Sequence, residues 1–220
     1  PALKHDMFEH VLTCVFTSIK NILPYYKAQL EKNWHPTSYK TIAETTVTIL
    51  GMGEIGKDVA TKFVNLGFTV KGWSNSPKNI EGVESFSGIN ELENAISQTD
   101  FIINILPLTA QTEGILNEQF FKFCSDNTVL INVGRGGHLV ENDLLTAIKN
   151  NKIKEAYLDV FIEEPLPENH PFWTNSQVYV TPHIASMTNA NTALEQVADN
   201  YKRMKNNETL LNQVSMERGY

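Results

Sequence analysis

Three short segments in the second half of the chain carry side chains that could do chemistry together. Arg135 lies in a glycine-rich turn after an apolar run, Glu164 precedes a proline, and His183 follows Thr181-Pro182. An arginine can bind a carboxylate through two parallel hydrogen bonds. A histidine can pass a proton to a carbonyl oxygen, and a neighbouring carboxylate favours the charged imidazole. Each residue alone also fits a surface or capping role, but together they predict proton transfer to a substrate that carries a carboxylate.

A glycine-rich turn earlier in the chain predicts a site for a dinucleotide. Gly51, Gly53 and Gly56 follow the apolar run 47–50 and precede a helical pattern over 57–66. The first glycine permits the tight turn, the second lets the backbone approach a pyrophosphate, and the third lets helix and strand pack closely. The helix N-terminus offers free N–H groups and a partial positive charge to the phosphates. The weaker alternative is a glycine turn that binds nothing.

The residues that follow the second predicted strand, 68–73, bear on which dinucleotide binds. An NAD site usually has Asp or Glu here, which binds the ribose 2′-hydroxyl. This chain instead has Ser74, Asn75, Ser76 and Lys78. A carboxylate would repel a 2′-phosphate, whereas two hydroxyls, an amide and a lysine can hold one, so we expect NADP. Because the segment has no arginine, we expect a modest preference, and NAD stays the alternative.

The elements that must position these residues form an alternation of short strands and helices. Helices are expected over 57–66, 90–96, 117–123 and 141–150, and strands over 47–50, 68–73, 101–105, 128–133, 153–160 and 178–180. This alternation predicts an α/β fold, a Rossmann-type doubly wound parallel sheet covered on both faces. Ligands bind such sheets at the carboxyl ends of the strands, which is where the arginine, the glutamate and the histidine are expected to meet.

Long helices are expected on either side of this region. Residues 6–31 show an apolar stripe at helical spacing, with Asp6 as the N-cap and a kink or break at Pro24. The stripe is wider than a lone surface helix needs, so we expect this linking helix to be buried between domains or in a dimer. A final helix is expected over 188–204. These elements divide the chain into a linking helix and connector (1–40), a dinucleotide-binding domain (41–187) and a C-terminal helix and tail (188–220).

Composition argues against several classes of protein. The 220 residues carry a net charge of −7, which disfavours nucleic acid or an anionic membrane as a partner. No apolar run is long enough to cross a bilayer. The two cysteines, Cys14 and Cys124, fit buried free thiols in a cytoplasmic protein. No metal is expected, because surface or capping roles suit the histidines that lack metal-site spacing, which are His5, His10, His35, His138 and His170.

Five motifs are spread over most of the chain: Gly51-x-Gly53-x-x-Gly56, Leu106-Pro-Leu-Thr109 with Thr112, Asn132-Val-Gly-Arg135-Gly, Leu158-Asp-Val-Phe with Glu164-Pro-Leu-Pro, and Thr181-Pro-His183. Together they resemble the D-isomer-specific 2-hydroxyacid dehydrogenases, and within them the glyoxylate/hydroxypyruvate reductase branch. The resemblance implies hydride transfer between NADP(H) and a small 2-oxo or 2-hydroxy acid. It places the family's catalytic residues on Arg135, Glu164 and His183. Glu164 is preferred to Glu163 because it directly precedes the proline.

The resemblance also implies contacts with the cofactor. The family's NADPH-preferring reductases likewise replace the acidic residue after the second strand, which supports NADP. Asp159 would bind the nicotinamide amide, and Ser186 would lie beside the same ring. The full cofactor set, including the glycine turn, is Gly51, Gly53, Glu54, Ile55, Gly56, Ser74, Asn75, Ser76, Lys78, Leu106, Pro107, Thr112, Val133, Gly134, Arg135, Asp159, His183 and Ser186.

Members of this family have a second, substrate-binding domain, built from their N-terminal part together with the final helix. The present chain begins at the helix that links the two domains, so we expect a proteolysed or trimmed protein, with a naturally short relative as the alternative. Such a chain should bind cofactor but catalyse poorly, because part of the cleft wall is absent. Apolar surface along residues 7–26 would be exposed unless a homodimer covers it. The sequence does not define which acid is the substrate.

A different class of function competes with the enzyme. Corepressors that share this fold sense a dinucleotide without turning it over, and such a binding module is the alternative hypothesis. The intact Arg135, Glu164 and His183 favour the enzyme, although sensors can retain these residues too. The acidic composition gives no support to a gene-regulatory role.

Overall fold

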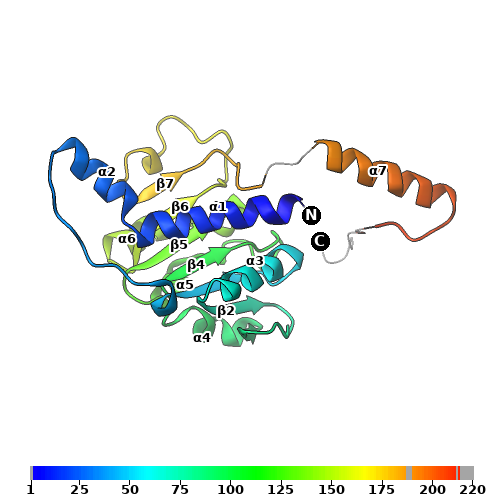
Figure 1. The fold of residues 1–220 in the computed structure, drawn as a ribbon, viewed down its shortest axis with the longest axis horizontal. Coiled ribbons are helices and arrows are strands. Elements are labelled where there is room, and N and C mark those ends of the chain that lie inside the picture. The colour runs from blue at the N-terminus through cyan, green and yellow to red at the C-terminus, as the bar shows by residue number, and fades with distance from the viewer. Residues whose placement is uncertain (1, 187–189, 212, 214–220) are drawn as a thin grey trace.

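The centre of the fold is a parallel sheet whose strands are rich in β-branched residues, which suit a pleated, buried surface. The computed structural model describes residues 2–186, 190–211 and 213 (Figure 1). The strands of the sheet are β1 (Thr46–Leu50), β2 (Thr69–Ser74), β3 (Val83–Ser87), β4 (Phe101–Asn104), β5 (Thr128–Asn132), β6 (Ile153–Leu158) and β7 (Val178–Val180). Their order is β3-β2-β1-β4-β5-β6-β7, and every neighbouring pair is parallel. The order reverses between β1 and β4, which confirms the doubly wound Rossmann-type fold and defines the crevice where its ligands bind.

Helices cover both faces of the sheet. One face carries α4 (Leu92–Ile96), α5 (Glu118–Phe123) and α6 (Glu141–Lys149), and the other carries α1 (Ala2–Ile19) and α3 (Glu54–Asn65). Short 3-10 turns are η1 (Ile42–Glu44), η2 (Ile89–Glu91), η3 (Gly136–His138) and η4 (Pro171–Trp173). The remaining helices are α2 (Ile22–Leu30) and α7 (Ala190–Lys205). Among the described residues no helix is long and apolar enough to cross a membrane.

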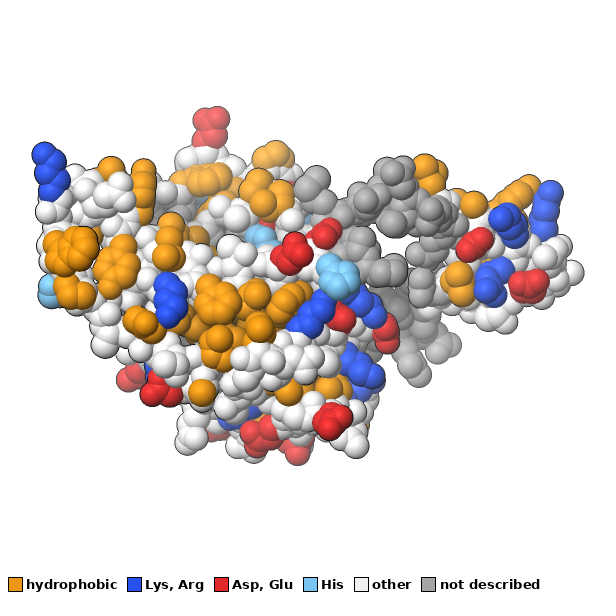
Figure 2. All heavy atoms as spheres, in the orientation of Figure 1, with side chains coloured by type: hydrophobic (Ala, Val, Ile, Leu, Met, Phe, Trp, Pro, Cys, Tyr) orange, Lys and Arg blue, Asp and Glu red, His pale blue; other side chains and the backbone are white. Residues whose placement is uncertain are grey.

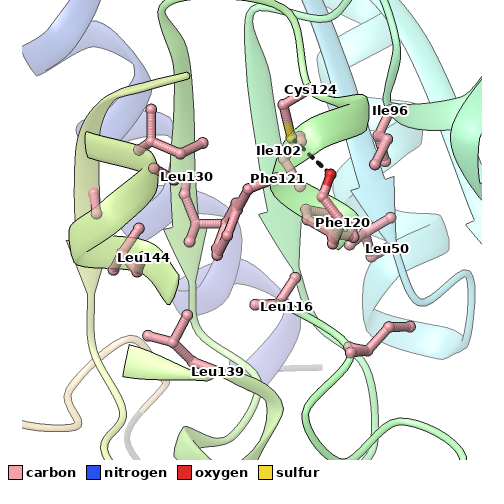
Figure 3. Close-up of a cluster of buried hydrophobic side chains, with 14 of the residues drawn as sticks. Leu50, Ile96, Ile102, Leu116, Phe120, Phe121, Cys124, Leu130, Leu139 and Leu144 are labelled. Carbon is pink, nitrogen blue, oxygen red and sulfur yellow. Dashed lines mark hydrogen bonds between the residues drawn. The ribbon is translucent and has the colours of Figure 1, made fainter. Parts of the chain in front are cut away.

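Two hydrophobic clusters hold these layers on the sheet. In the first, Leu130 of β5 packs with Phe120 and Phe121 of α5 and with Leu144 of α6 (Figure 3). In the second, strand residues of the other sheet face pack against α1 and α3, with Phe63 of α3 fully buried. Each fully buried Leu, Ile or Phe side chain contributes about 1.5–3 kcal/mol. Both faces are therefore covered mainly by apolar side chains.

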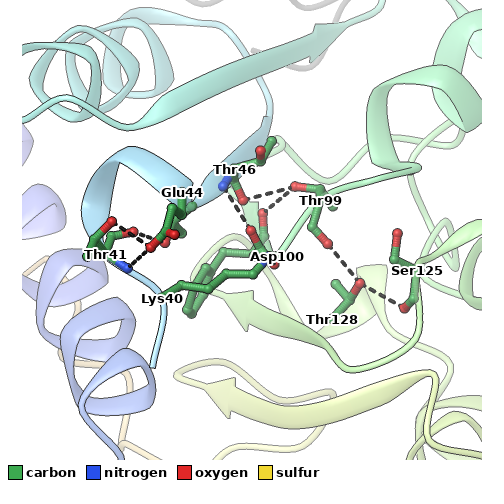
Figure 4. Close-up of polar contacts among 10 residues, drawn as sticks. Lys40, Thr41, Glu44, Thr46, Thr99, Asp100, Ser125 and Thr128 are labelled. Carbon is green, nitrogen blue, oxygen red and sulfur yellow. Dashed lines mark hydrogen bonds and ion pairs between the residues drawn. The ribbon is translucent and has the colours of Figure 1, made fainter. Parts of the chain in front are cut away.

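The edge at which the strands begin is closed by polar contacts (Figure 4). Asp100 accepts a hydrogen bond from the Thr46 N–H at 3.0 Å and forms an ion pair with Lys40 at 2.7 Å. The hydroxyl oxygen of Thr128 lies 3.0 Å from the carbonyl oxygen of Thr99 and 2.9 Å from that of Ser125. These contacts fix the start of β1, β4 and β5, which leaves the opposite edge free for ligands.

The N-terminal helix differs from its prediction in three ways. It begins at Ala2, so the proposed N-cap at Asp6 is wrong, and it ends at Ile19 before Pro24 is reached. The break lies at Asn21, whose φ of 51° is left-handed, and α2 begins at Ile22. Pro24 sits in the first turn of α2, where its missing N–H costs no helical hydrogen bond. The stretch is thus divided into two helices, as one form of the prediction had it, but at Asn21 and not at Pro24.

Because of this break, only part of the apolar stripe is buried. Its first part, along α1, is buried against α3 and the sheet, as Val11 and Val15 at 0% exposure show. Its continuation in α2 is exposed, and Figure 2 shows hydrophobic side chains gathered over this side of the molecule. Ile22 and Tyr26 are 52% and 57% exposed. The expected exposed apolar surface therefore lies on α2 rather than along the whole stretch.

Smaller differences concern the edges of the sheet. Strand β3, at one edge, was not predicted because Val-Glu-Ser-Phe-Ser has no continuous apolar run. Helix α3 begins at Glu54, three residues before its predicted start, and α4 begins at Leu92 after the turn η2. Helix α7 ends at Lys205, and its predicted start at Thr188 lies outside the described residues. Figure 1 shows α7 standing apart from the sheet.

Candidate active site

The glycine turn joins β1 to α3 at the point where the strand order reverses. Gly51 has a left-handed φ of 104°, and a Cβ there would lie 2.9 Å from the Ile105 carbonyl carbon. A Cβ on Gly56 would collide with the carbonyl of Gly51. By contrast, a Cβ on Gly53 would meet nothing within 4 Å. The first and third glycines are thus required for packing, while the second faces open space.

The open space lies in front of the N-terminus of α3. Gly53 is its N-cap and supplies no side-chain cap, so the N–H groups of the first turn have no intrahelical partner. Free N–H groups and the helix dipole suit a pyrophosphate, which is the contact expected for Glu54 and Ile55. The Glu54 carboxylate pairs with Lys4 of α1 at 2.8 Å, and this hydrogen bond lowers the pKa of Glu54. The arrangement fits a dinucleotide phosphate.

The segment expected to choose the cofactor lies beside this turn. The N–H of Gly51 donates to the Trp73 carbonyl at 2.8 Å, which brings the end of β2 next to the glycines. Ser74 is buried and its hydroxyl donates to the Ser76 carbonyl at 2.8 Å, while Asn75, Ser76 and Lys78 are exposed. No carboxylate occupies the segment.

The loop after β4 forms the next wall. Leu106 is buried, and its N–H donates to the Asn104 side chain at 3.3 Å. The Thr112 hydroxyl donates to the Pro107 carbonyl at 2.7 Å and accepts from the Thr109 N–H at 2.9 Å. Thr112 therefore holds the loop in shape, and the cofactor contact predicted for it stays a prediction.

Arg135 follows β5 in a turn packed under the next segment. Val133 and Gly134 are buried, whereas the Arg135 side chain is exposed and donates through Nη1 to the Gly134 carbonyl at 2.7 Å. Gly136 lies against the backbone of Phe161, where a Cβ would collide. The turn of the arginine thus rests directly on the segment that leads to Glu164.

Glu164 and His183 form a hydrogen-bonded pair. The ring Nδ1 of His183 lies 2.7 Å from Oε2 of Glu164, and Oε1 accepts from the Phe161 N–H at 2.9 Å. Burial opposes ionisation of Glu164, but the hydrogen bonds from His183 and Phe161 and the charges of His183 and Arg135 outweigh it, so the Glu164 pKa is lowered. The carboxylate is ionised at neutral pH and orients the ring.

Asp159 holds the turn that carries His183. The residue is 1% exposed; Oδ1 accepts from the Thr181 hydroxyl at 2.6 Å and the Ile184 N–H at 2.9 Å, and Oδ2 accepts from the Ala185 N–H at 2.8 Å. His183 has a left-handed φ of 54°, a conformation that costs about 1–2 kcal/mol for a residue with a Cβ. The three hydrogen bonds offset this strain. The contact with the nicotinamide amide that was expected for Asp159 stays a prediction.

The comparisons with known proteins agree with this geometry. The profile of the D-isomer specific 2-hydroxyacid dehydrogenase NAD binding domain matches residues 12–185. The chain belongs to this family. It is 42% identical over 215 residues to glyoxylate/hydroxypyruvate reductase A of Yersinia enterocolitica, covering 98% of this chain and 69% of that protein.

Two solved structures of the family are closely similar. A D-isomer specific 2-hydroxyacid dehydrogenase from Xanthobacter autotrophicus Py2, in complex with NADPH and MES, has a TM-score of 0.96 at 38% identity, covering 100% of this chain and 91% of that one. An NADPH-dependent glyoxylate/hydroxypyruvate reductase from Sinorhizobium meliloti, in complex with NADP and sulfate, has a TM-score of 0.95 at 35% identity, covering 100% and 71%. These likenesses extend from the sheet to its flanking helices.

In this dehydrogenase the predicted residues fall into two groups. Arg135, Glu164 and His183 lie together after β5, β6 and β7, while the residues around Ser74 lie across the reversal point, after β2. A dinucleotide that crosses the reversal point would contact both groups. Ser186 follows the His183 turn and is half-buried. Among the described residues, no group of three or more His, Cys, Asp or Glu could hold a metal ion.

Three polar residues of the site were not predicted. Asn104, Asn132 and His138 are 0% exposed and lie under the Arg135 turn. The capping role expected for His138 is confirmed, because its Nδ1 accepts from the Arg135 N–H at 3.1 Å, but its burial was not foreseen. A signal was present, since Phe-Ile-Ile-Asn and Val-Leu-Ile-Asn each end an apolar strand on an amide. An amide at that place has to find partners in the loops that follow.

Proposed function

We propose that this chain binds NADP(H) and supplies the catalytic groups for reduction of a small 2-oxo acid, such as glyoxylate or hydroxypyruvate. The observation that carries the proposal is the pair of His183 and Glu164 at 2.7 Å, beside Arg135 and across the sheet edge from an open phosphate turn. The names of the relatives and the NADPH and NADP complexes of two family members support the same choice.

Arg135 binds the substrate carboxylate in this proposal. A guanidinium has five N–H donors, and one of them is engaged with the Gly134 carbonyl. The exposed remainder can grip a carboxylate through two parallel hydrogen bonds. Because Gly136 packs on Phe161, the arginine is fixed relative to the segment that leads to Glu164. The acid is therefore held with its carbonyl toward the histidine.

His183 acts as the proton donor. Its Nδ1 is held by the ionised Glu164, so Nε2 is the ring atom left to hold the transferred proton and give it to the carbonyl oxygen. Asp159 keeps the ring in place through the turn 181–185. When NADPH is bound, its nicotinamide would supply the hydride to the carbonyl carbon. Gly53 and the N-terminus of α3 would hold its pyrophosphate, and the Asp159 carboxylate its amide.

Ser74, Asn75, Ser76 and Lys78 support NADP as the cofactor. They place two hydroxyls, an amide and an ammonium after β2 without any carboxylate to repel a 2′-phosphate. The binding module without turnover is not favoured, because a sensor has no use for the oriented pair of Glu164 and His183. Because the segment has no arginine to grip the 2′-phosphate, the preference for NADP in this proposal is modest, and NAD remains the alternative cofactor.

We also propose the compartment, the oligomeric state and the domain division of the protein. Cys14 and Cys124 are free and buried, which supports a reducing compartment such as the cytoplasm. The exposed apolar residues of α2 support a homodimer. The division into 1–40, 41–187 and 188–220 is supported by α7, whose apolar residues Leu194, Val197, Tyr201 and Met204 are exposed.

The test is NADPH oxidation followed at its absorbance band, with glyoxylate and hydroxypyruvate as substrates. His183→Ala should lower kcat by about 100-fold or more, the usual contribution of a positioned general acid, while NADPH affinity measured by fluorescence stays within about twofold. The control is His35→Ala, which removes an exposed histidine of the connector. Unchanged turnover in His183→Ala would exclude this mechanism, and tighter binding of NADH than of NADPH would exclude the cofactor preference.

A further inference from the structure

Under the Arg135 turn lies a group of polar side chains that the reaction itself does not use. Asn104 ends β4, Asn132 ends β5, and His138 ends the 3-10 turn η3; all three are 0% exposed. A buried polar group without a partner costs about 1–3 kcal/mol, so the contacts of these three side chains decide what they are for. Each contact leads toward a loop of the site.

The ring of His138 joins two of these loops. Its Nδ1 lies 3.1 Å from the Arg135 backbone nitrogen and 2.9 Å from Nδ2 of Asn104, and its Nε2 lies 3.2 Å from the Pro107 carbonyl oxygen. Both neighbours of Nδ1 are N–H donors, so Nδ1 must accept and carry no proton. The carbonyl at Nε2 requires a donor there. The geometry therefore fixes a neutral ring with its proton on Nε2.

The two asparagines extend the same connection. Nδ2 of Asn104 donates to Oδ1 of Asn132 at 2.9 Å, and Oδ1 of Asn104 accepts from the Leu106 N–H at 3.3 Å. Oδ1 of Asn132 accepts from the Gly134 N–H at 3.3 Å, and its Nδ2 donates to the Arg135 carbonyl at 3.3 Å. Every outward bond of the network thus ends on the backbone of 106–107 or of 134–135.

Close packing makes the connection stiff. A Cβ added to Gly134 would lie 3.0 Å from Nδ2 of Asn104 and 3.1 Å from Nδ1 of His138. The backbone of the turn therefore rests directly on the network with no room between them. A shift of the histidine would move the backbone of Arg135, and a misplacement of about 1 Å is enough to cost a large part of a rate.

We propose that His138, supported by Asn104 and Asn132, is a positioning residue that couples the Arg135 turn to the Leu106–Pro107 loop. It acts through these two loops, so that the substrate-binding arginine and one wall of the cofactor site keep a fixed geometry. The coupling rests on the proposed function only for the roles of Arg135 and of Leu106 and Pro107.

Two substitutions each keep only one of the two backbone contacts of the His138 ring. His138→Asn keeps an acceptor near the Arg135 N–H but cannot reach Pro107, whereas His138→Gln keeps a donor that reaches Pro107 but loses the acceptor. We expect His138→Asn to raise the NADPH Kd about tenfold with little change in KM for glyoxylate. We expect His138→Gln to raise the KM for glyoxylate about tenfold with little change in the NADPH Kd. His138→Leu should raise both. A tenfold change corresponds to the loss of one hydrogen bond.

The matched control is Thr128→Val. Thr128 is 1% exposed and begins the same strand that Asn132 ends, and the substitution removes its buried hydrogen bonds at the opposite edge of the sheet. We expect it to lower the melting temperature as much as the His138 variants do, with unchanged Kd and KM. If Thr128→Val shifts Kd and KM like His138→Leu, the network serves stability alone and the proposal is wrong.

A spectroscopic test does not depend on turnover. Long-range ¹H–¹⁵N spectra report the tautomer of each histidine, and His138→Gln assigns the resonance. A neutral ring protonated at Nε2 is expected; a charged ring, or a proton on Nδ1, would overturn the proposal. If the wild-type chain binds NADPH but reduces neither acid, the proposed function fails, while the coupling is still decided by the tautomer and by the NADPH Kd of the three variants.

Discussion

Opposing effects act on single residues at the centre of the site. At Glu164 burial disfavours the charge, but hydrogen bonds from His183 and the Phe161 N–H, with the nearby positive charges, prevail and lower the pKa. At His183 a strained backbone is held by three bonds to the buried Asp159. In both cases His183, the proton donor of the proposed function, is exposed, while the carboxylate that orients it is bonded to backbone N–H groups. In the proposed function, this anchoring keeps the hydrogen bond between Glu164 and His183 in place between turnovers.

Replacement of Glu164 by Gln tests this view of the pair. The amide keeps the size of the side chain but loses the charge that holds Nδ1, so kcat should fall about 100-fold or more with a smaller change in KM. Because the wild-type pKa is lowered, the stability that Glu164 contributes is complete above its ordinary pKa of about 4.5 and is lost as the pH falls through the lower folded value.

The measurement combines turnover with urea unfolding at several pH values. The wild type should lose part of its free energy of unfolding below pH 4.5, and Glu164→Gln should lack that part of the loss. Glu163→Gln is the control, because this neighbouring carboxylate is exposed and both His183 and the Phe161 N–H bond to Glu164 instead. Equal turnover in wild type and Glu164→Gln would show that the carboxylate does not orient the ring.

Secondary-structure elements position the residues of the site. At the glycine turn, strand β1 and helix α3 do so together. Gly56→Ala should drive a Cβ into the Gly51 carbonyl and separate α3 from β1, with a loss of about 1–3 kcal/mol in the free energy of unfolding and weak NADPH binding. Gly53→Ala meets open space at an ordinary φ of −77°, so its stability should be unchanged while NADPH binding falls.

The variants Gly56→Ala and Gly53→Ala are compared by thermal unfolding and by fluorescence titration with NADPH. The difference between the two variants is more informative than either result alone. A loss of NADPH binding without a loss of stability in Gly53→Ala would show that this glycine is needed for the ligand and not for the fold. Wild-type NADPH affinity in Gly53→Ala would mean that the phosphates lie elsewhere.

Prediction from sequence worked at this scale where the pattern was physically decisive. β4 and β5 are short apolar runs and β1 is nearly so, which the buried centre of a parallel sheet requires, whereas β6 was identified although Lys154 and Glu155 interrupt it. β3 was missed because an edge strand has no such need. The break in the N-terminal helix was predicted at Pro24 but lies at Asn21, because one left-handed residue leaves no periodic signal. Arg135, Glu164 and His183 were identified by type and place, while the network of His138 depends on contacts between loops far apart in sequence.

The whole molecule consists of two hydrophobic clusters on opposite faces of one sheet. Each cluster contains one cysteine: Cys124 packs with α5 and α6, and Cys14 of α1 packs on the other face. If α1 belongs to the same cooperative unit as the sheet, both clusters should open together. If α1 is only a link, its face should open first, at a lower free energy.

Thiol labelling distinguishes these two cases. Burial raises the pKa of Cys14 and of Cys124 to about 12, so at pH 8 only about one thiol in ten thousand is ionised. Labelling by an aromatic disulfide reagent should therefore be negligible in the native state and should follow unfolding. We expect the two thiols to react with the same dependence on urea, because Val11 and Val15 of α1 are as completely buried as the strand residues they contact.

The single variants Cys14→Ala and Cys124→Ala assign each rate, and labelling in concentrated urea gives the unprotected limit. Faster labelling of Cys14 than of Cys124 at low urea would show that α1 detaches while the sheet stays folded. That result would bear on the site too. Lys4 reaches Glu54 at the phosphate turn from the same helix, so detachment of α1 would release this ion pair and weaken NADPH binding together with the burial of Cys14.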